Sequence, residues 1–346
     1  MPGNRQVVIA ALPSGRLAVS DFELRDGDVP PVGEGELRCR TIAITIGAGQ
    51  RAGLQGSASY AGAPVVGAVM GGTGVARVEV SNDPAFAPGD LVVAPTGWQE
   101  LSVHRGRAVE RIEAGAHGDA TGGAAGADVD PALHLGVLGT NGLTAYFGLL
   151  EIGRPVAGET VVVSAASGSV GHLVGQIAKA VGCRVVGVAG SPQKCALLVE
   201  RLGFDAAVDH RDPDFRARFK DAVTGGIDVY FDNTGGDILG AALRRMNAHG
   251  RIVCCGVVSQ YDTTTPQPGP SGIPGLLVNQ RVRMEGFLVF DHAARYGEAR
   301  AQLRSWIADG TLVPLVDEWH GLAQAPAAFV DLLAGGNVGT RVVRVS

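Results

Sequence analysis

Residues 160–171, TVVVSAASGSVG, carry the pattern that decides the fold of this chain. The apolar, β-branched run at 161–164 is typical of a strand that is buried on both faces. The spacing Ala165-x-x-Gly168-x-x-Gly171 then turns the chain without a bulky side chain and leads into an amphipathic run that ends near Val181. Backbone N–H groups at such a turn, at the positive end of a helix, can bind a pyrophosphate. A glycine pattern alone also fits an ordinary strand-to-helix turn, so the neighbouring sequence has to distinguish that turn from a pyrophosphate-binding one.

The context is a βαβ unit whose second strand, residues 184–189, ends in Ala189-Gly190-Ser191. A site that selects NAD usually has Asp or Glu at this strand end to hold the ribose hydroxyls, and no acid occurs here. Lys194 follows early in the next helix, where its ammonium can pair with the additional ribose phosphate of NADP. The alternative is a solvated lysine, although a cation near a helix N-terminus opposes the helix dipole. The sequence therefore predicts NADP(H) as the cofactor.

Length, composition and net charge restrict the number of domains, the partners and the compartment that can be expected for this chain. The chain has 346 residues, 46% of them hydrophobic, which is enough for two domains with their own cores. A net charge of −5 gives no basic surface for nucleic acid. The N-terminus lacks an apolar signal segment and no apolar stretch is long enough to cross a bilayer, so no membrane partner is expected. The five cysteines show no C-x-x-C spacing and are expected to be reduced thiols in the cytoplasm.

Three regions follow one another along the chain. Residues 1–130 contain short alternating runs broken by glycine and proline, which indicates a β-rich, barrel-like domain. In residues 131–309 strands alternate with helical patterns, and this alternation predicts a doubly wound parallel sheet. Residues 310–346 return to strand character and are expected to complete the first domain. The predicted fold is therefore α/β, with a parallel Rossmann sheet inserted into a β-rich domain.

Several motifs together resemble one known family. They are GLTAYFGL at 142–149, AASGSVG at 165–171 with VGQIAK at 174–179, Gly190-Ser191 with Lys194, LGFD at 202–205, YFDN-x-GG at 230–236, CGVVSQY at 255–261, EGFLV at 285–289 and GNVG at 336–339. The chain resembles the zinc-independent medium-chain dehydrogenases/reductases of the alkenal and enone reductase branch, which includes prostaglandin reductases and curcumin reductase. The resemblance covers almost the whole length and implies a GroES-like first domain and a homodimer.

The resemblance also implies a set of cofactor-binding residues. Residues 168–171 would lie along the pyrophosphate, residues 255–261 around the nicotinamide ribose, and the backbone of 287–289 beside the carboxamide. The implied positions are Gly168, Ser169, Val170, Gly171, Lys194, His210, Asn233, Cys255, Gly256, Val257, Val258, Ser259, Tyr261, Phe287, Leu288, Val289 and Asn337.

Some of these positions have a second interpretation. Asn233 and Asn337 fit turns that their side chains would simply cap. His210 stands where relatives often have Tyr beside the adenosine phosphate. Arg211 can contact that phosphate in its place, and otherwise both are solvated loop residues.

Zinc-dependent relatives carry an early catalytic Cys, a Gly-His-Glu segment and a four-Cys lobe, and this sequence has none of them. We therefore expect no metal site. Without a metal to polarise a carbonyl, alcohol oxidation is disfavoured, whereas hydride addition to a conjugated double bond needs only a proton donor near the developing enolate. Tyr261 is the best candidate for this catalytic role, and the alternative is that its ring only packs at the cofactor edge.

The predicted function is NADPH-dependent reduction of a carbon–carbon double bond conjugated to a carbonyl. Hydride would add to the β-carbon and a proton to the α-carbon of a small molecule held in a cleft between the domains. A secondary metabolite is a plausible substrate, and an enolate could also close a ring. The alternatives are an NADPH quinone reductase of the same superfamily and a catalytically idle NADPH-binding subunit.

Overall fold

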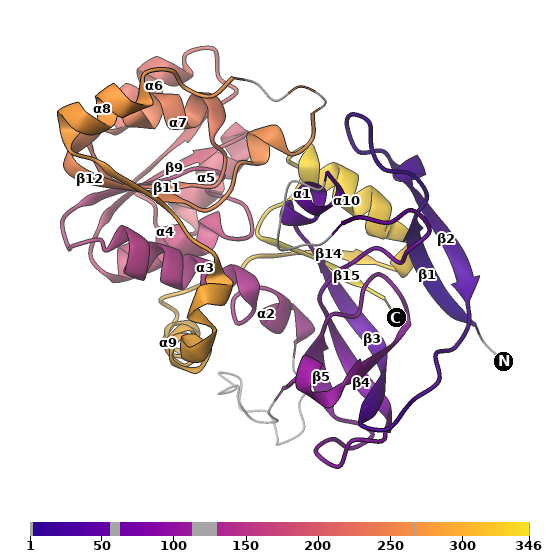
Figure 1. Ribbon diagram of the computed structural model, residues 1–346. Coiled ribbons are helices and arrows are strands. Elements are labelled where there is room, and N and C mark those ends of the chain that lie inside the picture. The colour runs from indigo at the N-terminus through magenta and orange to yellow at the C-terminus, as the bar shows by residue number, and fades with distance from the viewer. Residues whose placement is uncertain (1–2, 56–62, 113–129, 264, 266–267, 346) are drawn as a thin grey trace. The chain divides into compact units, whose positions relative to one another are not determined.

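The computed structural model describes residues 3–55, 63–112, 130–263, 265 and 268–345. The chain separates into two compact units (Figure 1). The first comprises Met1–Gly136, Val316–Gly336 and Thr340–Ser346, and the second comprises Val137–Leu315 and Asn337–Gly339. Relative to the boundaries expected from the sequence, the structure assigns 131–136 to the first unit and both 310–315 and 337–339 to the second.

The first unit contains two sheets. Strands β1 (Asn4–Ile9) and β2 (Phe22–Gly27) form an antiparallel pair. A seven-stranded sheet has the order β14-β15-β3-β4-β5-β7, with β6 paired to β3. Its strands are β3 (Glu36–Ile46), β4 (Gly74–Ser81), β5 (Leu91–Ala94), β6 (Leu101–Arg105), β7 (Glu110–Arg111), β14 (Val316–His320) and β15 (Thr340–Arg344). Because β15 lies antiparallel to β3, the C-terminal segment completes the sheet begun near the N-terminus.

Three short α-helices accompany these sheets: α1 (Gly49–Leu54), α2 (Pro131–Leu135) and α10 (Ala325–Leu333). The 3₁₀ turns are η1 (Val19–Asp21), η2 (Gly106–Ala108) and η6 (Leu322–Gln324). An aromatic cluster of Phe22, Trp98 and Phe329 forms the centre of one core, with ring centroids 5.4 to 6.4 Å apart. Aromatic pairs at such distances add to the stabilisation that burial provides.

The second unit contains a six-stranded sheet in the order β10-β9-β8-β11-β12-β13, and every neighbouring pair is parallel. The strands are β8 (Thr160–Val163), β9 (Arg184–Ala189), β10 (Ala206–Asp209), β11 (Ile227–Asp232), β12 (Met246–Cys254) and β13 (Arg283–Gly286). The α-helices are α3 (Thr140–Phe147), α4 (Gly171–Ala180), α5 (Pro192–Glu200), α6 (Phe215–Ala222), α7 (Gly236–Leu243), α8 (Ile273–Gln280) and α9 (Tyr296–Ala308). A π-helix η3 (Gly148–Gly153) and the 3₁₀ segments η4 (Val258–Gln260) and η5 (Val289–Arg295) complete the unit.

This arrangement confirms the predicted doubly wound sheet. Figure 1 shows α3 and α4 on one face and α6, α7 and α8 on the other. All four residues of β8 are buried, as expected for a strand covered on both sides. Strand order runs from β8 through β9 to β10 in one direction and from β11 through β12 to β13 in the other. The order therefore reverses between β8 and β11, and ligands of such sheets bind beyond the carboxyl ends of the strands at this point.

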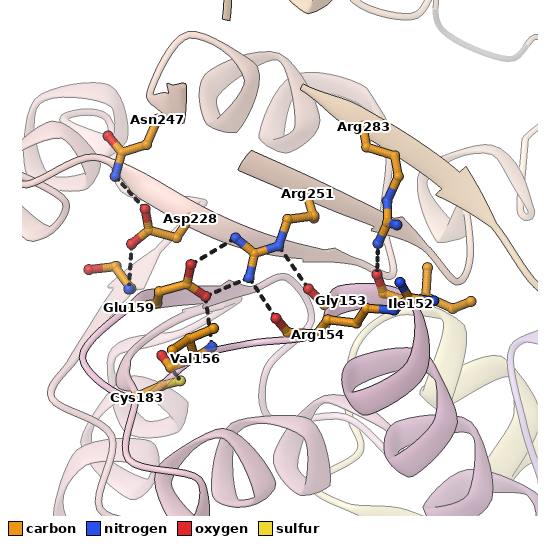
Figure 2. A network of polar contacts seen from close by, with 11 residues as sticks. Ile152, Gly153, Arg154, Val156, Glu159, Cys183, Asp228, Asn247, Arg251 and Arg283 are labelled. Carbon is orange, nitrogen blue, oxygen red and sulfur yellow. Dashed lines mark hydrogen bonds and ion pairs between the residues drawn. The ribbon is translucent and has the colours of Figure 1, made fainter. Parts of the chain in front are cut away.

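At the opposite, amino ends of the strands an ion pair joins β12 to β8 (Figure 2). The Arg251 guanidinium donates to both carboxylate oxygens of Glu159, from Nη1 at 2.9 Å and from Nη2 at 2.5 Å. It also donates to the carbonyl oxygens of Gly153 and Arg154, at 2.9 and 2.8 Å. Burial alone would raise the pKa of Glu159, but the hydrogen bonds from Arg251 and from the Val156 N–H outweigh it and hold that pKa below its usual range.

A second carboxylate continues the network along the same edge. Asp228 accepts from the Thr160 N–H at 2.8 Å and from the Asn247 side-chain amide at 2.7 Å, and the Arg283 guanidinium donates to the carbonyl of Ile152. Figure 2 shows these contacts side by side. Together they connect β8, β11, β12 and β13 at their amino ends.

We predict that Arg251→Ala lowers the free energy of unfolding by about 2 to 3 kcal/mol, because it leaves two carbonyls without this donor and Glu159 with only the Val156 N–H. Arg218→Ala is the control: the Arg218 side chain is 64% exposed, against 17% for Arg251, so loss of its pair with Asp212 should cost less than about 1 kcal/mol. Since the pKa of Glu159 is depressed in the folded state, its contribution is present above the unfolded-state pKa and disappears as the pH falls through the folded-state value. Urea denaturation between pH 7 and pH 3 should show the Arg251→Ala difference shrinking. A difference that stays constant with pH would contradict this account.

Candidate cofactor site

Most of the segments implied for cofactor binding follow the carboxyl ends of the parallel strands. The turn at 168–171 comes after β8, Lys194 after β9, His210 after β10, Asn233 after β11, Cys255 after β12 and Phe287 after β13. Because parallel strands have their carboxyl ends at one edge of the sheet, the fold brings these segments together there.

The turn after β8 has the geometry of an anion-binding loop. Ala165 adopts a left-handed conformation (φ 47°), and the Gly168 N–H donates back to its carbonyl at 2.9 Å. A Cβ at Gly171 would lie 2.3 Å from the Ala165 oxygen, so only glycine permits the helix to start this close to the turn. Among the described residues, the N–H groups of Val170 and Gly171 have no hydrogen-bond partner. These two donors lie at the N-terminus of α4, where a pyrophosphate would bind.

Residues 337–339 lie directly against this turn. The Gly339 N–H donates to the Ser167 carbonyl at 2.8 Å, and Ser169 Oγ donates to the Gly339 carbonyl at 3.2 Å. The side-chain amide of Asn337 donates to the Gly339 carbonyl at 3.0 Å, as in the turn-capping interpretation. Its main-chain carbonyl accepts from Lys194 Nζ at 2.7 Å. The structure thus brings Asn337 and Lys194 together beside the turn.

Lys194 belongs to a basic cluster around Gly190. A Cβ at Gly190 would lie 3.2 Å from His210 Nε2 and 3.6 Å from Arg211 Nε, so the missing side chain leaves space between these groups. Loss of hydration around the ring lowers the pKa of His210, and the Arg211 and Lys194 cations lower it further, against the opposing effect of Asp209. A phosphate dianion would be attracted to the two cations, and the neutral imidazole can donate one further hydrogen bond.

Asp232, at the end of β11, is the polar centre of this edge. Its Oδ1 accepts from Tyr230 Oη at 3.0 Å, from Ser164 Oγ at 3.2 Å, and from the backbone N–H groups of Thr234 and Gly235 at 3.0 and 2.9 Å. Asp232 is buried. Burial raises the pKa of Tyr230 well above its ordinary value, and the neighbouring carboxylate adds to this, so the phenol remains a donor. Reasoning from the sequence assigned no role to Ser164 or Asp232, although a charged residue ending an otherwise apolar buried strand was a usable signal.

Asn233 points into the protein. Its Nδ2 donates to the Ser164 carbonyl at 2.7 Å, and its backbone N–H donates to Ser164 Oγ at 2.9 Å. Both contacts connect the end of β11 to the end of β8. In this structure the Asn233 side chain therefore joins the end of β11 to the end of β8, which differs from the turn-capping interpretation.

The loop 255–261 is fixed to the same edge by backbone bonds. The N–H groups of Cys255 and Gly256 both donate to the Asp232 carbonyl, at 2.9 and 3.1 Å, and the Val258 N–H donates to the Asn233 carbonyl at 3.2 Å. A Cβ at Gly235 would lie 3.0 Å from Val257 Cγ2, so the turn after β11 packs closely on this loop.

Tyr261 turns back onto its own loop. Its hydroxyl oxygen accepts a hydrogen bond from the Val257 N–H at 3.3 Å. This bond uses the oxygen as an acceptor and does not consume the phenolic proton.

The Cys255 thiol lies in the same loop. Burial, followed by the nearby Asp232, raises the pKa of this thiol to about 12, so at neutral pH it is protonated and is not a nucleophile.

Residues 287–289 offer mainly their N–H groups. The Phe287 ring packs inward, since a Cβ at Gly148 would lie 2.4 Å from its Cζ. The Leu288 carbonyl accepts from the Asp291 N–H at 3.1 Å, and the Val289 carbonyl accepts from Tyr296 Oη at 3.1 Å. The N–H groups of this backbone can donate to a carboxamide oxygen.

Comparison with known proteins identifies the family of this chain. Residues 5–112 match the family described as N-terminal domain of oxidoreductase, and residues 169–305 match the family described as zinc-binding dehydrogenase. The NADPH-dependent curcumin reductase of Escherichia coli (strain K12) is 38% identical over 99% of this chain and 97% of that protein. The chain belongs to the NADP-dependent alkenal and enone reductase branch of the medium-chain dehydrogenases/reductases.

Two further members of this family share most of the chain. The 2-alkenal reductase (NADP(+)-dependent) of Nicotiana tabacum is 38% identical over 99% of this chain and 98% of that protein. The crystal structure of CurA from Vibrio vulnificus in complex with NADPH is 38% identical, covers 99% of both chains and superposes with a TM-score of 0.91. The resemblance inferred from the motifs and the predicted fold class are thereby confirmed.

One family description mentions zinc. In the described part of the chain, no group of three or more His, Cys, Asp or Glu side chains is arranged to hold a metal ion. Over the same residues, no helix has the length and apolar character that crossing a bilayer requires.

We predict that Lys194→Ala weakens NADPH binding by about 10- to 100-fold and leaves NADH binding nearly unchanged, because one charge-assisted contact to the ribose phosphate contributes about 1.5 to 3 kcal/mol. The ammonium has three donors, so it can keep the Asn337 carbonyl and still contact a phosphate. Lys220→Ala, an exposed lysine on α6, is the control. Titration by cofactor fluorescence measures both affinities, and equal wild-type affinities for NADPH and NADH would exclude the assignment.

Proposed function

We propose that this protein catalyses NADPH-dependent reduction of a carbon–carbon double bond conjugated to a carbonyl. The observation that carries the proposal is the pair of N–H groups of Val170 and Gly171, which have no partner among the described residues and lie beside a basic cluster at the next strand end. These features fit a pyrophosphate and an additional phosphate at one edge of the sheet. Two relatives support the proposal by their names, an NADPH-dependent curcumin reductase and a 2-alkenal reductase (NADP(+)-dependent).

In this proposal each segment at the carboxyl edge of the parallel sheet contacts a different part of NADPH or supports a segment that does. The turn at 168–171 binds the pyrophosphate, and Lys194 with His210 and Arg211 holds the ribose phosphate. The loop 255–261 lies along the nicotinamide ribose, and its position depends on the carbonyls of Asp232 and Asn233. The N–H groups of 287–289 contact the carboxamide, and the peptide of Asn337 connects Lys194 to the turn.

When bound, NADPH supplies the hydride that adds to the β-carbon of the substrate. Tyr261 then donates a proton toward the enolate. The Val257 N–H hydrogen bond to its oxygen holds the phenol on the loop 255–261. General acid assistance of this kind is worth about 10²- to 10⁴-fold in rate. The ribose hydroxyl and water are the competing proton sources.

Deuterium labelling tests the reaction directly. NADPH deuterated at the transferred position should place deuterium on the β-carbon of an enone, while solvent deuterium appears at the α-carbon. The assay should be run after dialysis against a strong chelator, and activity is expected to remain. Deuterium on the carbinol carbon, faster NADPH consumption with benzoquinones than with enones, or activity that returns only with zinc would each overturn part of the proposal. NADPH binding without turnover of any of these compounds would indicate an idle subunit.

Tyr261→Phe is the second arm of this test. The variant should lower turnover more than it lowers NADPH affinity, because a proton donor acts mainly in the transition state. Tyr146→Phe, which removes a phenol from α3, serves as the control. Unchanged turnover in Tyr261→Phe would assign the proton to water or to the ribose.

We also propose that the protein is a homodimer that pairs through β13. Among the described strands this one pairs only with β12, so its other edge is open. In an antiparallel pairing of two copies about Met284, Arg283 lies opposite Glu285 of the partner subunit. None of the eight residues described for α8 is buried, and Val278 is 74% exposed.

Light scattering should then give about twice the 35.4 kDa chain mass. Arg283→Glu should yield monomer, because it places like charges opposite each other, and adding Glu285→Arg should restore the dimer. A wild-type monomer would exclude this interface.

The cytoplasmic location is likewise a proposal. It is supported by the five cysteines, none of which forms a disulfide, and cell fractionation tests it.

A further inference from the structure

His172, in the first turn of α4, is fully enclosed by the protein and has no part in the reaction proposed above. Both of its ring nitrogens are used. Nδ1 lies 2.8 Å from the carbonyl oxygen of Gly168, and Nε2 lies 3.1 Å from the backbone nitrogen of Leu315. One imidazole therefore joins the phosphate-binding turn to a segment 143 residues later in the chain.

These contacts define the tautomer. The Leu315 N–H can only donate, so Nε2 must be the acceptor, and the proton must be on Nδ1, which donates to the Gly168 carbonyl. Burial lowers the pKa of His172 to about 4, against the raising effect of the Gly168 and Ser169 backbone, so the ring is neutral around pH 7.

Gln176 extends the same contact by one helical turn. Its Oε1 accepts from the Val313 N–H at 2.8 Å and its Nε2 donates to the Val313 carbonyl at 3.1 Å. Residues 313–315 are thus held against α4 through side chains, much as a neighbouring strand would be held. The Leu315 carbonyl in turn lies close to Gly339, where a Cβ would be only 2.2 Å from its oxygen.

The Gly168 carbonyl is the decisive group in this arrangement. It accepts from the His172 N–H at 3.2 Å as well as from the imidazole. Gly168 has no side chain to restrict its peptide, and a carbonyl that rotated toward a pyrophosphate would present its negative end to an anion. Two donors hold this oxygen on the helix side, which leaves the Val170 and Gly171 N–H groups directed at the ligand position.

We propose that His172 is a positioning residue for the cofactor, which orients the Gly168 peptide for pyrophosphate binding and sets it relative to residues 313–315. The proposal rests on the proposed function, since it concerns the same nucleotide. It predicts that the imidazole contributes to the affinity for the pyrophosphate part of NADP and does not contribute to the affinity for the adenosine 2′-phosphate part.

Two variants separate the two contacts of His172. An asparagine amide nitrogen reaches about the place of Nδ1, so His172→Asn keeps the bond to Gly168 and loses the bond to Leu315. A glutamine amide oxygen reaches about the place of Nε2, so His172→Gln keeps the hydrogen bond to Leu315 and loses the hydrogen bond to Gly168. Both variants lose one buried hydrogen bond, so both should lower the melting temperature.

Binding of NADP⁺ and of adenosine 2′-phosphate, which lacks the pyrophosphate, is measured by calorimetry or competition. His172→Gln should weaken NADP⁺ binding about tenfold, the effect of losing one hydrogen bond, and leave adenosine 2′-phosphate binding unchanged. His172→Asn should bind both ligands within about twofold of wild type. Gln176→Leu is the matched control, and should lower stability without changing the ratio of the two affinities. Equal NADP⁺ affinities in the Asn and Gln variants, or equal losses for both ligands, would overturn the proposal.

A measurement on the unaltered protein covers the case in which the variants do not fold. In histidine-selective ¹⁵N spectra, His172 should show the Nδ1-protonated tautomer, and its resonances should shift with NADP⁺ and not with adenosine 2′-phosphate. The other tautomer, or resonances that do not respond to NADP⁺, would contradict the role of His172. A protein that binds neither nucleotide would instead contradict the proposed function, so the two failures are distinguishable.

Discussion

The cofactor edge of the second unit depends on one buried carboxylate. Oδ1 of Asp232 accepts hydrogen bonds from Tyr230, from Ser164 and from two N–H groups of the following turn, and its main-chain carbonyl accepts from Cys255 and Gly256. A buried anion is tolerated only with such donors around it, and hydrogen bonds to a charged group are stronger than those between neutral groups. Because the donors come from the end of β8, from β11 with its following turn, and from the loop after β12, the carboxylate and the main-chain carbonyl of Asp232 together fix the relative positions of three segments of the proposed cofactor edge.

The two ends of the parallel sheet are stabilised differently. At the amino ends, Arg251 and Glu159 form a forked ion pair that ties β12 to β8 and to the end of η3. At the carboxyl ends, the Asp232 carboxylate accepts from hydroxyl and backbone donors, and two N–H groups at the start of α4 are left without a partner among the described residues. The forked ion pair thus lies at the end of the sheet away from these two N–H groups, which stay available for an anion.

The alternation of apolar runs and helical patterns predicted the parallel sheet, because strands that are buried on both faces are apolar along their whole length. The turn at 168–171 could be predicted for a similar reason, since glycine at these positions follows from local sterics. The orientations of individual side chains could not be predicted from the sequence. Nothing near Asn233 indicates that its amide turns inward to Ser164, and nothing near His172 indicates Leu315, because both contacts join segments far apart in the sequence. Lys194 was identified by its position after β9, but its contact with the Asn337 carbonyl required the fold.

The three residues 337–339 separate two pieces of the first unit, yet belong to the second by their contacts. Gly339 completes the hydrogen bonding of the turn at 168–171, and along the chain it comes after residues 137–315 and after a further stretch of the first unit. During synthesis, residues 137–315 leave the ribosome well before this tripeptide does. The turn therefore cannot acquire all of its hydrogen bonds until residues 316–339, most of which belong to the other unit, have also been synthesised.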